Sequence, residues 1–326
     1  MDASIIIPVK NGGEVFVNVL DRIQAQKTTY EYELICVDSG STDNSVEVAK
    51  QHGAKVYEIL PEEFGHGKTR NYGASLGSGE FIIFLTQDAT PVDEHWLESF
   101  LDAMKLDDRI AGGFGKHLPY PDCNPADRQM LYNHFARYGE ENFIHELTEE
   151  KREQYFNDDS YRQYLSFFSD NCSCLRRSVW EKIPYDDTDF SEDQIWARKI
   201  LEAGYKKVYV PKACVYHSHN YPLFTYKKRY YDEFKAIYRV QNVNFCPNLL
   251  TFIRRVLGDT KYQCGYVKHC EDYSGTEKIK WYFYCLVRNM LRYSSAHQAV
   301  KYFSLNDEQK KKMDERYSQQ LEQIKG

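Results

Sequence analysis

The sequence predicts an α/β fold in which a mostly parallel sheet is flanked by helices and followed by a helical C-terminal extension. Short apolar runs alternate with stretches of helical periodicity four times over residues 4–85, which is typical of a parallel, helix-covered sheet. From about residue 226 the apolar spacing is helical, with many aromatic and basic side chains. We therefore expect two regions, residues 1–225 and residues 226–326.

The elements follow from where apolar runs give way to polar residues. SIIIPV at 4–9 ends in KNGG, and ELICVD at 33–38 ends in a Ser- and Asp-rich loop. Residues 119–165 contain three prolines among charged, aromatic-rich segments and predict an insertion over the sheet edge. We expect strands at 4–9, 33–38, 55–59, 80–85 and 207–211, and helices at 14–27, 44–52 and 68–76.

Composition excludes several classes of protein. Of 326 residues, 42% are hydrophobic and 28% are charged, as in folded globular proteins. No apolar run approaches the roughly 20 residues of a membrane-spanning helix, and the N-terminus does not resemble a signal peptide. The nine cysteines are an odd number at spacings that do not match a zinc site, so we expect reduced thiols in a cytoplasmic protein.

Charge is divided unevenly along the chain. Residues 227–326 carry 19 Lys/Arg and 11 Asp/Glu, a net charge of +8, whereas the preceding residues carry 23 and 37, a net charge of −14. An acidic body does not suit a nucleic-acid enzyme. It suits a protein that binds a metal in the body and contacts an anionic surface with the tail.

Several carboxylates occupy positions where chemistry is expected. Asp88 follows a buried strand, where a carboxylate can hold Mg²⁺ or Mn²⁺ against a diphosphate or simply cap the next helix. Glu192 and Asp193 open an amphipathic helix, which favours acids for electrostatic reasons alone. One of them aimed into a cleft would act as a general base.

Two further segments carry ligand chemistry. His217 and His219 lie two residues apart after a strand, so their side chains point the same way. They can bind one metal ion together or form polar surface. Lys68 and Arg70 lie in a glycine-containing segment that opens a helix, suited to a phosphate or sugar nucleotide. The spacing of that segment does not match a P-loop.

Six segments, in this order, resemble the family 2 inverting glycosyltransferases of the GT-A fold, in particular their bacterial rhamnosyltransferase branch. The resemblance covers about residues 3–225. The matching segments are IIIPVKNGG at 5–13, VDSGSTDNS at 37–45, GHGKTRNYGA at 65–74, FLTQDATP at 84–91, SEDQIWARKILEAGY at 191–205 and VYHSHNY at 215–221.

The resemblance implies a role for each matching residue. Asp38 would contact the nucleotide base, with Asp43 as its loop partner, and Asp193 would be the catalytic base beside Glu192. Asp88 corresponds to the second Asp of an Asp-x-Asp motif and would bind the metal, Mg²⁺ or Mn²⁺, with His217 or His219. The remaining donor-binding residues would be Pro8, Val9, Lys10, Lys68, Arg70, Thr86 and Gln87.

Two departures from the family pattern refine the expectation. Thr86 replaces the first Asp of Asp-x-Asp, which commonly contacts ribose hydroxyls, and so suits a thymidine donor better than a uridine donor. The Gln-x-x-Arg-Trp motif of processive synthases is absent, since the chain has QIWAR at 194–198. A processive synthase is therefore not expected.

The resemblance implies an inverting, metal-dependent hexosyltransferase. It would move L-rhamnose from dTDP-rhamnose to a hydroxyl of a glycan or an undecaprenyl-type lipid-linked acceptor, in O-antigen, capsule or rhamnan synthesis. The acceptor would enter over residues 112–114, beneath the 119–165 insertion. A UDP-hexose donor, or a non-catalytic sugar-nucleotide- or carbohydrate-binding protein of this fold, remains an alternative, and the oligomeric state is open.

The tail suggests where such an enzyme would work. Ser274 and Glu277 have the spacing of a capping box, and a helix with basic and aromatic residues follows them. This helix either packs on the catalytic domain or contacts an anionic membrane surface. We expect peripheral attachment to the inner face of the plasma membrane.

Overall fold

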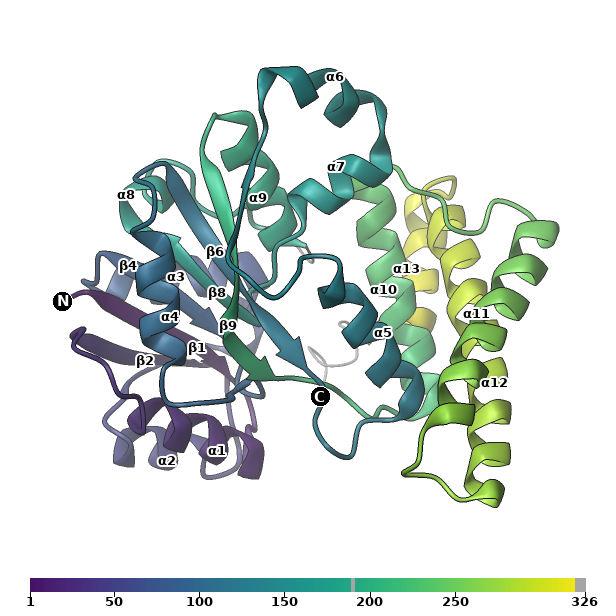
Figure 1. The fold of residues 1–326 in the computed structure, drawn as a ribbon, viewed down its shortest axis with the longest axis horizontal. Helices are drawn as coiled ribbons and strands as arrows, with labels where there is room; N and C mark the ends of the chain where they lie inside the picture. The colour runs from purple at the N-terminus through teal and green to yellow at the C-terminus, as the bar shows by residue number, and fades with distance from the viewer. Residues whose placement is uncertain (189–190, 320–326) are drawn as a thin grey trace. The chain divides into compact units, whose positions relative to one another are not determined.

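The computed structural model describes residues 1–188 and 191–319, so the end of the predicted basic tail, residues 320–326, lies outside it. The chain forms two compact units (Figure 1). The first contains residues 1–120 and 134–217, and the second contains residues 121–133 and those from 218 onward. Part of the segment expected to be an insertion therefore belongs to the second unit.

The first unit is built on a nine-stranded mixed sheet with the order β3-β2-β1-β4-β8-β6-β9-β5, in which β7 also pairs with β9. β1 pairs in parallel with β2 and β4, so the carboxyl ends of these three strands meet at one edge. β5, β7 and β8 run antiparallel to their neighbours. The strands are β1 (Ala3–Val9), β2 (Tyr32–Asp38), β3 (Lys55–Glu58), β4 (Phe81–Leu85), β5 (Thr90–Pro91), β6 (Ile110–Leu118), β7 (Phe143–Glu146), β8 (Cys172–Arg176) and β9 (Lys206–Tyr216).

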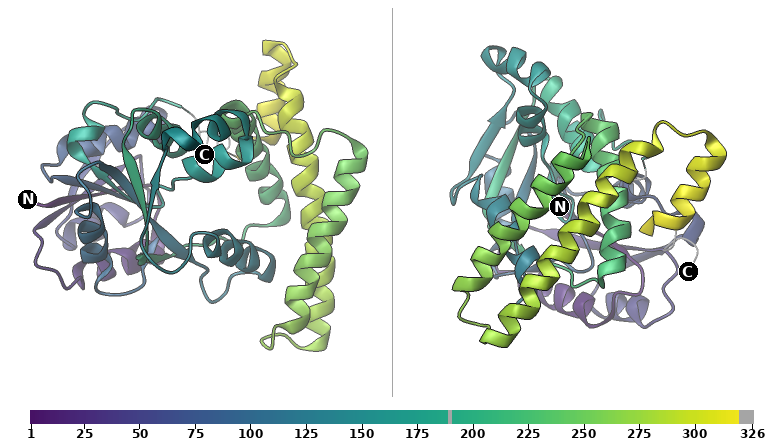
Figure 2. Two further views of the ribbon diagram at one scale, coloured as in Figure 1. Left: turned by 45° about the horizontal axis from the view of Figure 1, so that its top comes forward. Right: turned by 90° about the vertical axis from the view of Figure 1, so that its right-hand side faces the viewer.

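Helices cover both faces of the sheet (Figure 2). Ile5 and Ile7 share a buried core with α1 and α4. Ile6 points to the other face, where α3 packs so closely that a Cβ on Gly73 would lie 2.4 Å from the Ile6 side chain. The helices of this unit are α1 (Gly13–Gln24), α2 (Ser45–Gln51), α3 (His66–Leu76), α4 (Trp96–Met104), α6 (Glu149–Asn157), α7 (Asp159–Ser166), α8 (Arg177–Trp180) and α9 (Glu192–Glu202).

The four strands expected within residues 4–85 are confirmed as β1 to β4, each within one residue of its predicted bounds, and the expected helices are α1, α2 and α3. The strand expected at 207–211 is the first half of β9. Strands β6 and β7 were not predicted. The three glycines of β6, in IAGGFGKHL, weaken its strand signal.

The prediction that an acceptor enters over residues 112–114 is wrong. These residues lie inside β6 and are buried. A Cβ on Gly112 would meet the Trp196 ring at 2.8 Å, and the Phe114 side chain is fully buried against Tyr138, Phe167 and Tyr209. Glycine is required here because the α9 tryptophan covers the strand, which leaves no room for a sugar.

The second unit is helical and has its own core of aromatic and aliphatic side chains. Arg288 is fully buried and forms an ion pair with Asp127. The predicted capping box is confirmed, since Ser274 and Glu277 bond to each other's backbone at the start of α12. The helices are α5 (Pro125–Ala136), whose last turn belongs to the first unit, α10 (Leu223–Gln241), α11 (Leu249–His269), α12 (Gly275–Tyr302) and α13 (Asp307–Tyr317).

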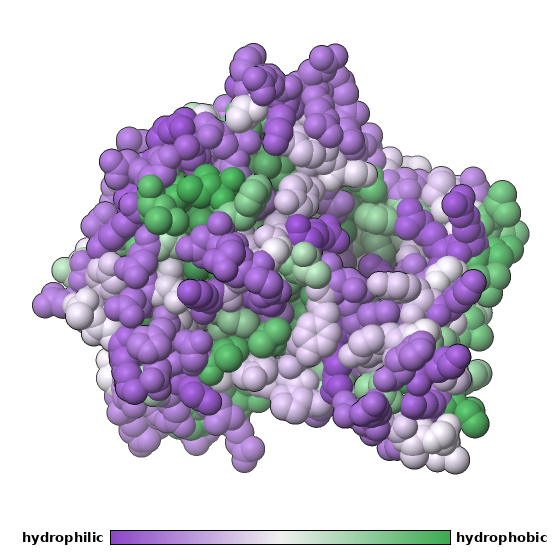
Figure 3. Space-filling model, in the orientation of Figure 1, coloured by the Kyte–Doolittle hydropathy of each residue, from purple (hydrophilic) through white to green (hydrophobic). Residues whose placement is uncertain are grey.

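Apolar side chains remain exposed on the α11–α12 hairpin. Leu249 and Leu250 are 72% and 76% exposed, and Ile279 and Phe283 on α12 are 68% and 69% exposed. Figure 3 shows apolar surface over the first turns of α11. Within the described residues, no helix is both long and apolar enough to cross a membrane.

Candidate active site

Asp38 ends β2 beside Val9, its pairing partner in β1. Its side chain is buried, and Oδ2 accepts hydrogen bonds from the backbone N–H groups of Gly40 and Ser41 at 3.0 and 2.9 Å. Oδ1 is also buried but has no hydrogen-bond partner within the described chain. A buried carboxylate oxygen without a partner is costly, so this atom fits a donor group of a bound ligand.

The loop after β1 is held by side chains from neighbouring loops. The Gln87 amide accepts from the Lys10 N–H at 2.8 Å and donates to the Lys10 carbonyl at 3.1 Å. Asp43 accepts from the Gly13 N–H at 3.2 Å and from the Ser45 N–H at 3.0 Å, and these bonds help to lower its pKa. Gln87 and Asp43 therefore shape the loop around Lys10 through backbone bonds.

Thr86 and Asp88 follow β4 at the same edge of the sheet. The Thr86 hydroxyl is buried and has no hydrogen-bond partner among the residues that the structure describes, so it too can serve a ligand. The Asp88 backbone carbonyl accepts from the Tyr120 hydroxyl at 3.1 Å, and the Asp88 carboxylate extends toward β9. Thr86 and Asp88 of the tetrapeptide TQDA thus place a hydroxyl and a carboxylate at the same edge of the sheet.

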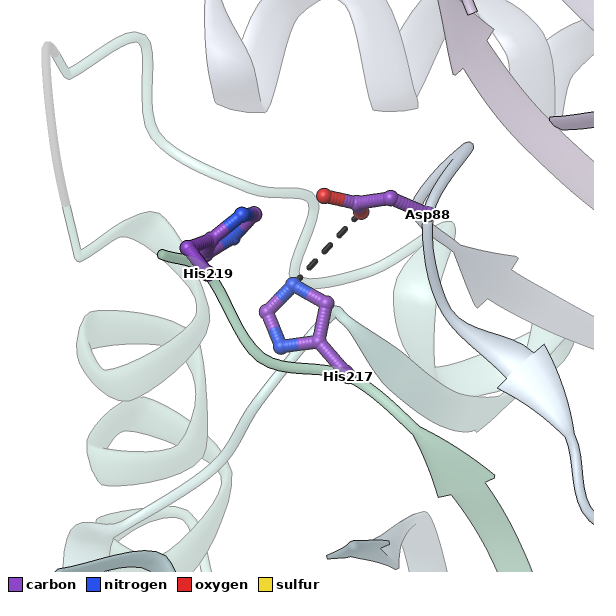
Figure 4. A group of neighbouring side chains, drawn as sticks. All are labelled: Asp88, His217 and His219. Carbon is purple, nitrogen blue, oxygen red and sulfur yellow. Dashed lines mark ion pairs between the residues drawn. The ribbon is translucent and has the colours of Figure 1, made fainter. Parts of the chain in front are cut away.

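Asp88 meets a histidine that follows β9 (Figure 4). Asp88 Oδ1 lies 3.5 Å from His217 Nε2, and Asn171 Nδ2 lies 3.3 Å from His217 Nδ1. The chain carries His219 two residues further on, and one ligand atom from each of Asp88, His217 and His219 lies within 4.8 Å of the others. One carboxylate oxygen and two imidazole nitrogens suit a divalent ion such as Mn²⁺, so these residues fit the expected metal.

A second cluster centres on the buried Arg70 of α3. Its Nη1 lies 2.6 Å from Glu192 Oε1, and its Nε lies 3.5 Å from Asp170 Oδ2. The guanidinium is thus enclosed by two buried carboxylates, and it holds the start of α9 against α3. Lys68, in contrast, is exposed on the same helix. The structure therefore places the two predicted basic donor residues in different surroundings.

Asp193 is the partly exposed member of this cluster. Its Oδ1 accepts from the Gln194 N–H at 2.7 Å and its Oδ2 accepts from the Asp170 N–H at 3.3 Å. Withdrawal from water, together with the nearby charges of Glu192 and Asp170, raises the pKa of Asp193 well above its usual value. A carboxylate of raised proton affinity that keeps contact with solvent has the properties of a general base.

The start of α9 is locally strained. Ser191, which precedes the helix, has a φ of 64°, a left-handed conformation that is uncommon for a residue with a side chain. Gly67 of α3 lies so close that a Cβ there would be 2.2 Å from the carbonyl oxygen of Asp186. Backbone strain of this kind occurs often at functional sites, and here it lies two residues before Asp193.

The motif analysis missed Asp170, Asn171 and Tyr185. Asp170 is 2% exposed, and its Oδ1 accepts from Ser173 Oγ and from the Tyr185 hydroxyl, both at 2.7 Å. The one available signal was the polar stretch SDN directly before the apolar strand β8, at the carboxylate-rich edge.

Comparison with known proteins agrees with this geometry. The glycosyl transferase family 2 domain matches residues 4–183, which is more than half of the chain. The chain therefore belongs to glycosyl transferase family 2.

Two curated relatives are similar over most of their length. The O-antigen chain rhamnosyltransferase RfbN of Salmonella typhimurium is 33% identical over 236 residues, covering 71% of each chain. The O-antigen chain rhamnosyltransferase WbaN of Salmonella anatum is 32% identical over 232 residues, covering 70% of each.

Solved structures show the same fold. The mannosyltransferase PcManGT from Pyrobaculum calidifontis, solved with GDP-Man and Mn²⁺, has a TM-score of 0.55 at 14% identity and covers 91% of this chain and 86% of its own. TarS residues 1–349 of S. aureus, solved with UDP-GlcNAc, has a TM-score of 0.52 at 13% identity and covers 93% of this chain and 92% of its own. The expected GT-A fold is therefore confirmed.

Proposed function

We propose that this glycosyltransferase transfers L-rhamnose from dTDP-rhamnose, with inversion and with a divalent metal, to a hydroxyl of a glycan or lipid-linked acceptor in cell-surface polysaccharide synthesis. The names of the two Salmonella relatives support the sugar and the pathway class. The geometry of the cluster supports the mechanism.

One observation carries the proposal. Two consecutive residues bridge the two halves of the site: the Asp170 N–H donates to Asp193, and the Asn171 side chain contacts His217. Consecutive Cα atoms are about 3.8 Å apart, so the proposed base and the proposed metal ligand belong to one site. A separate helix-capping acid and a separate pair of surface histidines would not require this link.

In the proposed reaction, an acceptor hydroxyl attacks the anomeric carbon of the donor while its proton passes to an Asp193 carboxylate oxygen. The new carbon–oxygen bond forms as the sugar–phosphate bond breaks and the nucleoside diphosphate leaves. Attack opposite the leaving group inverts the anomeric centre. A metal held by Asp88 with His217 or His219 would offset the charge of the diphosphate.

Donor binding is assigned to the edge formed by β1, β2 and β4. The free oxygen of Asp38 would accept a hydrogen bond from the N–H of a pyrimidine base, in a pocket formed with Pro8, Val9 and Lys10. Thr86 replaces an acid that commonly contacts ribose hydroxyls in the family, which supports a donor nucleotide that contains deoxyribose. Lys68 is exposed and would contact a phosphate of the donor. Arg70 is enclosed by carboxylates, so we assign it to holding the base in place.

A donor screen tests the proposal. The purified protein is incubated with Mn²⁺ and dTDP-rhamnose, UDP-glucose, UDP-galactose or GDP-mannose, and release of nucleoside diphosphate is measured with and without glycan acceptors. Of the four donors, we expect the protein to turn over only dTDP-rhamnose. Turnover of a UDP-hexose instead would establish the alternative donor. Calorimetric binding of a donor without turnover of any of the four would indicate a non-catalytic binding protein.

We further propose that the protein attaches peripherally to the cytoplasmic face of the plasma membrane, where a lipid-linked acceptor would be found. The exposed leucines of α11 and the exposed Phe283 of α12 offer apolar side chains to the interface. The net charge of +8 over residues 227–326 adds attraction to anionic lipid, at about 1 kcal/mol per Lys or Arg near the surface.

A further inference from the structure

We propose that Asp170 is a positioning residue for the transfer reaction, which orients Asp193 through its peptide N–H and Arg70 through its carboxylate. This inference rests on the proposed role of Asp193 as the base. It assigns a function to a buried side chain that neither the family motifs nor the relatives point to.

Contacts from four segments of the chain converge on Asp170. The residue reaches α3 through Arg70, α9 through Asp193, the segment after α8 through Tyr185, and the following strand β8 through Ser173. Its side chain is 2% exposed. A buried residue whose carboxylate contacts three segments, and whose backbone N–H contacts a fourth, fixes their positions relative to one another, because moving any one of them breaks a hydrogen bond or an ion pair.

The charges around Asp193, the proposed base, are unevenly balanced. The groups that face Asp170 are the Arg70 guanidinium, the carboxylates of Glu192 and Asp193, and the hydroxyls of Tyr185 and Ser173. Three carboxyl groups thus share one cation. Like charges so close disfavour ionisation of all three. Burial and the charge of Glu192 raise the pKa of Asp170 to about 6, although Arg70 and the hydrogen bonds from Ser173 and Tyr185 oppose this shift. Above that pH Asp170 is charged, and its charge repels a charge on Asp193.

The neighbouring residue, Asn171, links Asp170 to two other segments of the proposed site. The Asn171 carbonyl accepts a hydrogen bond from the Thr86 N–H at 3.3 Å, and the Asn171 side chain contacts His217. The Asp170–Asn171 turn is therefore fastened to β4, to the histidine after β9 and to the start of α9. The position of Asp170 therefore affects the positions of both the proposed base, Asp193, and the proposed metal ligand, His217.

The test replaces Asp170 with Asn, which keeps the shape of the side chain and removes its charge. Donor turnover is measured against pH with whichever donor the screen identifies. We expect Asp170→Asn to lower kcat roughly 10- to 100-fold, with little change in donor KM. Without the repelling charge the pKa of Asp193 falls, so the acidic limb of the kcat profile should move down by about one pH unit.

Two further variants keep the test decisive if Asp170→Asn folds poorly. Tyr185→Phe removes one hydrogen bond to Asp170 and should move the acidic limb in the same direction by a smaller amount. Asp186→Asn is the matched control, since Asp186 is a partly exposed acid in the same segment, paired with Lys199. It should leave the profile unchanged.

Asp193→Asn, assayed in parallel, separates the two hypotheses. If Asp193→Asn keeps near-normal turnover, the proposed base is wrong. If Asp193→Asn is inactive while Asp170→Asn and Tyr185→Phe both show the wild-type kcat and an unmoved acidic limb, the role proposed for Asp170 is wrong and that of Asp193 stands.

Discussion

Replacing Asp193 with Asn should nearly abolish transfer while making the protein more stable. The side chain accepts hydrogen bonds from two backbone N–H groups and has no direct ion pair in the described structure, whereas Glu192 and Asp170 both repel its charge. The amide of Asn satisfies one of the two N–H donors and removes the repulsion. Loss of a general base typically lowers the rate by about 10²–10⁴.

The stability effect has a definite dependence on pH. The folded protein raises the pKa of Asp193 above its unfolded value, so the folded state binds the proton more tightly. Asp193 therefore destabilises the fold increasingly as pH rises from the unfolded pKa, about 3.9, to the higher folded value. Asp193→Asn should raise the Tm at pH 8 and have a smaller effect near pH 4.

Glu192→Gln is the matched comparison, because it changes the adjacent carboxylate. Glu192 contacts Arg70 at 2.6 Å, and breaking a buried pair costs about 3–5 kcal/mol when one charge is left alone. The remaining Asp170 contact reduces this cost. We expect Glu192→Gln to lower the Tm while donor binding persists.

The assays are donor turnover, donor binding by calorimetry and thermal unfolding at pH 4 and pH 8. A variant Asp193→Asn with near-wild-type kcat would refute the assignment and point to Glu192 as the base. A lower Tm for Asp193→Asn at pH 8 would refute the electrostatic argument independently of activity.

Three other perturbations test separate parts of the structure. Asp88→Ala should weaken donor binding and remove the response of activity to Mn²⁺, and full activity of the wild-type protein in excess EDTA would contradict the proposed metal site. Leu250→Ser combined with Phe283→Ser should reduce co-sedimentation with anionic liposomes, while retention equal to that of wild type, or no binding by either protein, would count against membrane attachment. Gly67→Ala should lower stability by about 1–3 kcal/mol in chemical denaturation, because its Cβ would lie 2.2 Å from the Asp186 carbonyl oxygen; an unchanged midpoint would show that this contact is not tight.

Much of the fold was predictable because local patterns decide it. Strands β1, β2 and β4 are apolar runs that a helix-covered sheet must bury on both faces, so their sequence signal is strong. The capping box of α12 is similarly local, since Ser274 and Glu277 are three residues apart and bond to one another. Asp38 and Asp88 were found because Asp38 ends one such strand and Asp88 lies three residues after another.

The sequence by itself determined the α/β class, the family and the edge of the sheet where we expect the donor to bind, because those features depend on neighbours in the chain. Only the tertiary structure decided which side chains share the site. Arg70 and Glu192 are 122 residues apart and meet at 2.6 Å, which turns an expected phosphate contact into a buried ion pair. The polar stretch SDN before β8 is a weak signal for Asp170, since its contacts with Arg70, Asp193 and Tyr185 arise only when α3, α9 and β8 pack together. Burial and charge at a site depend on such long-range packing, and periodicity along the chain does not record them.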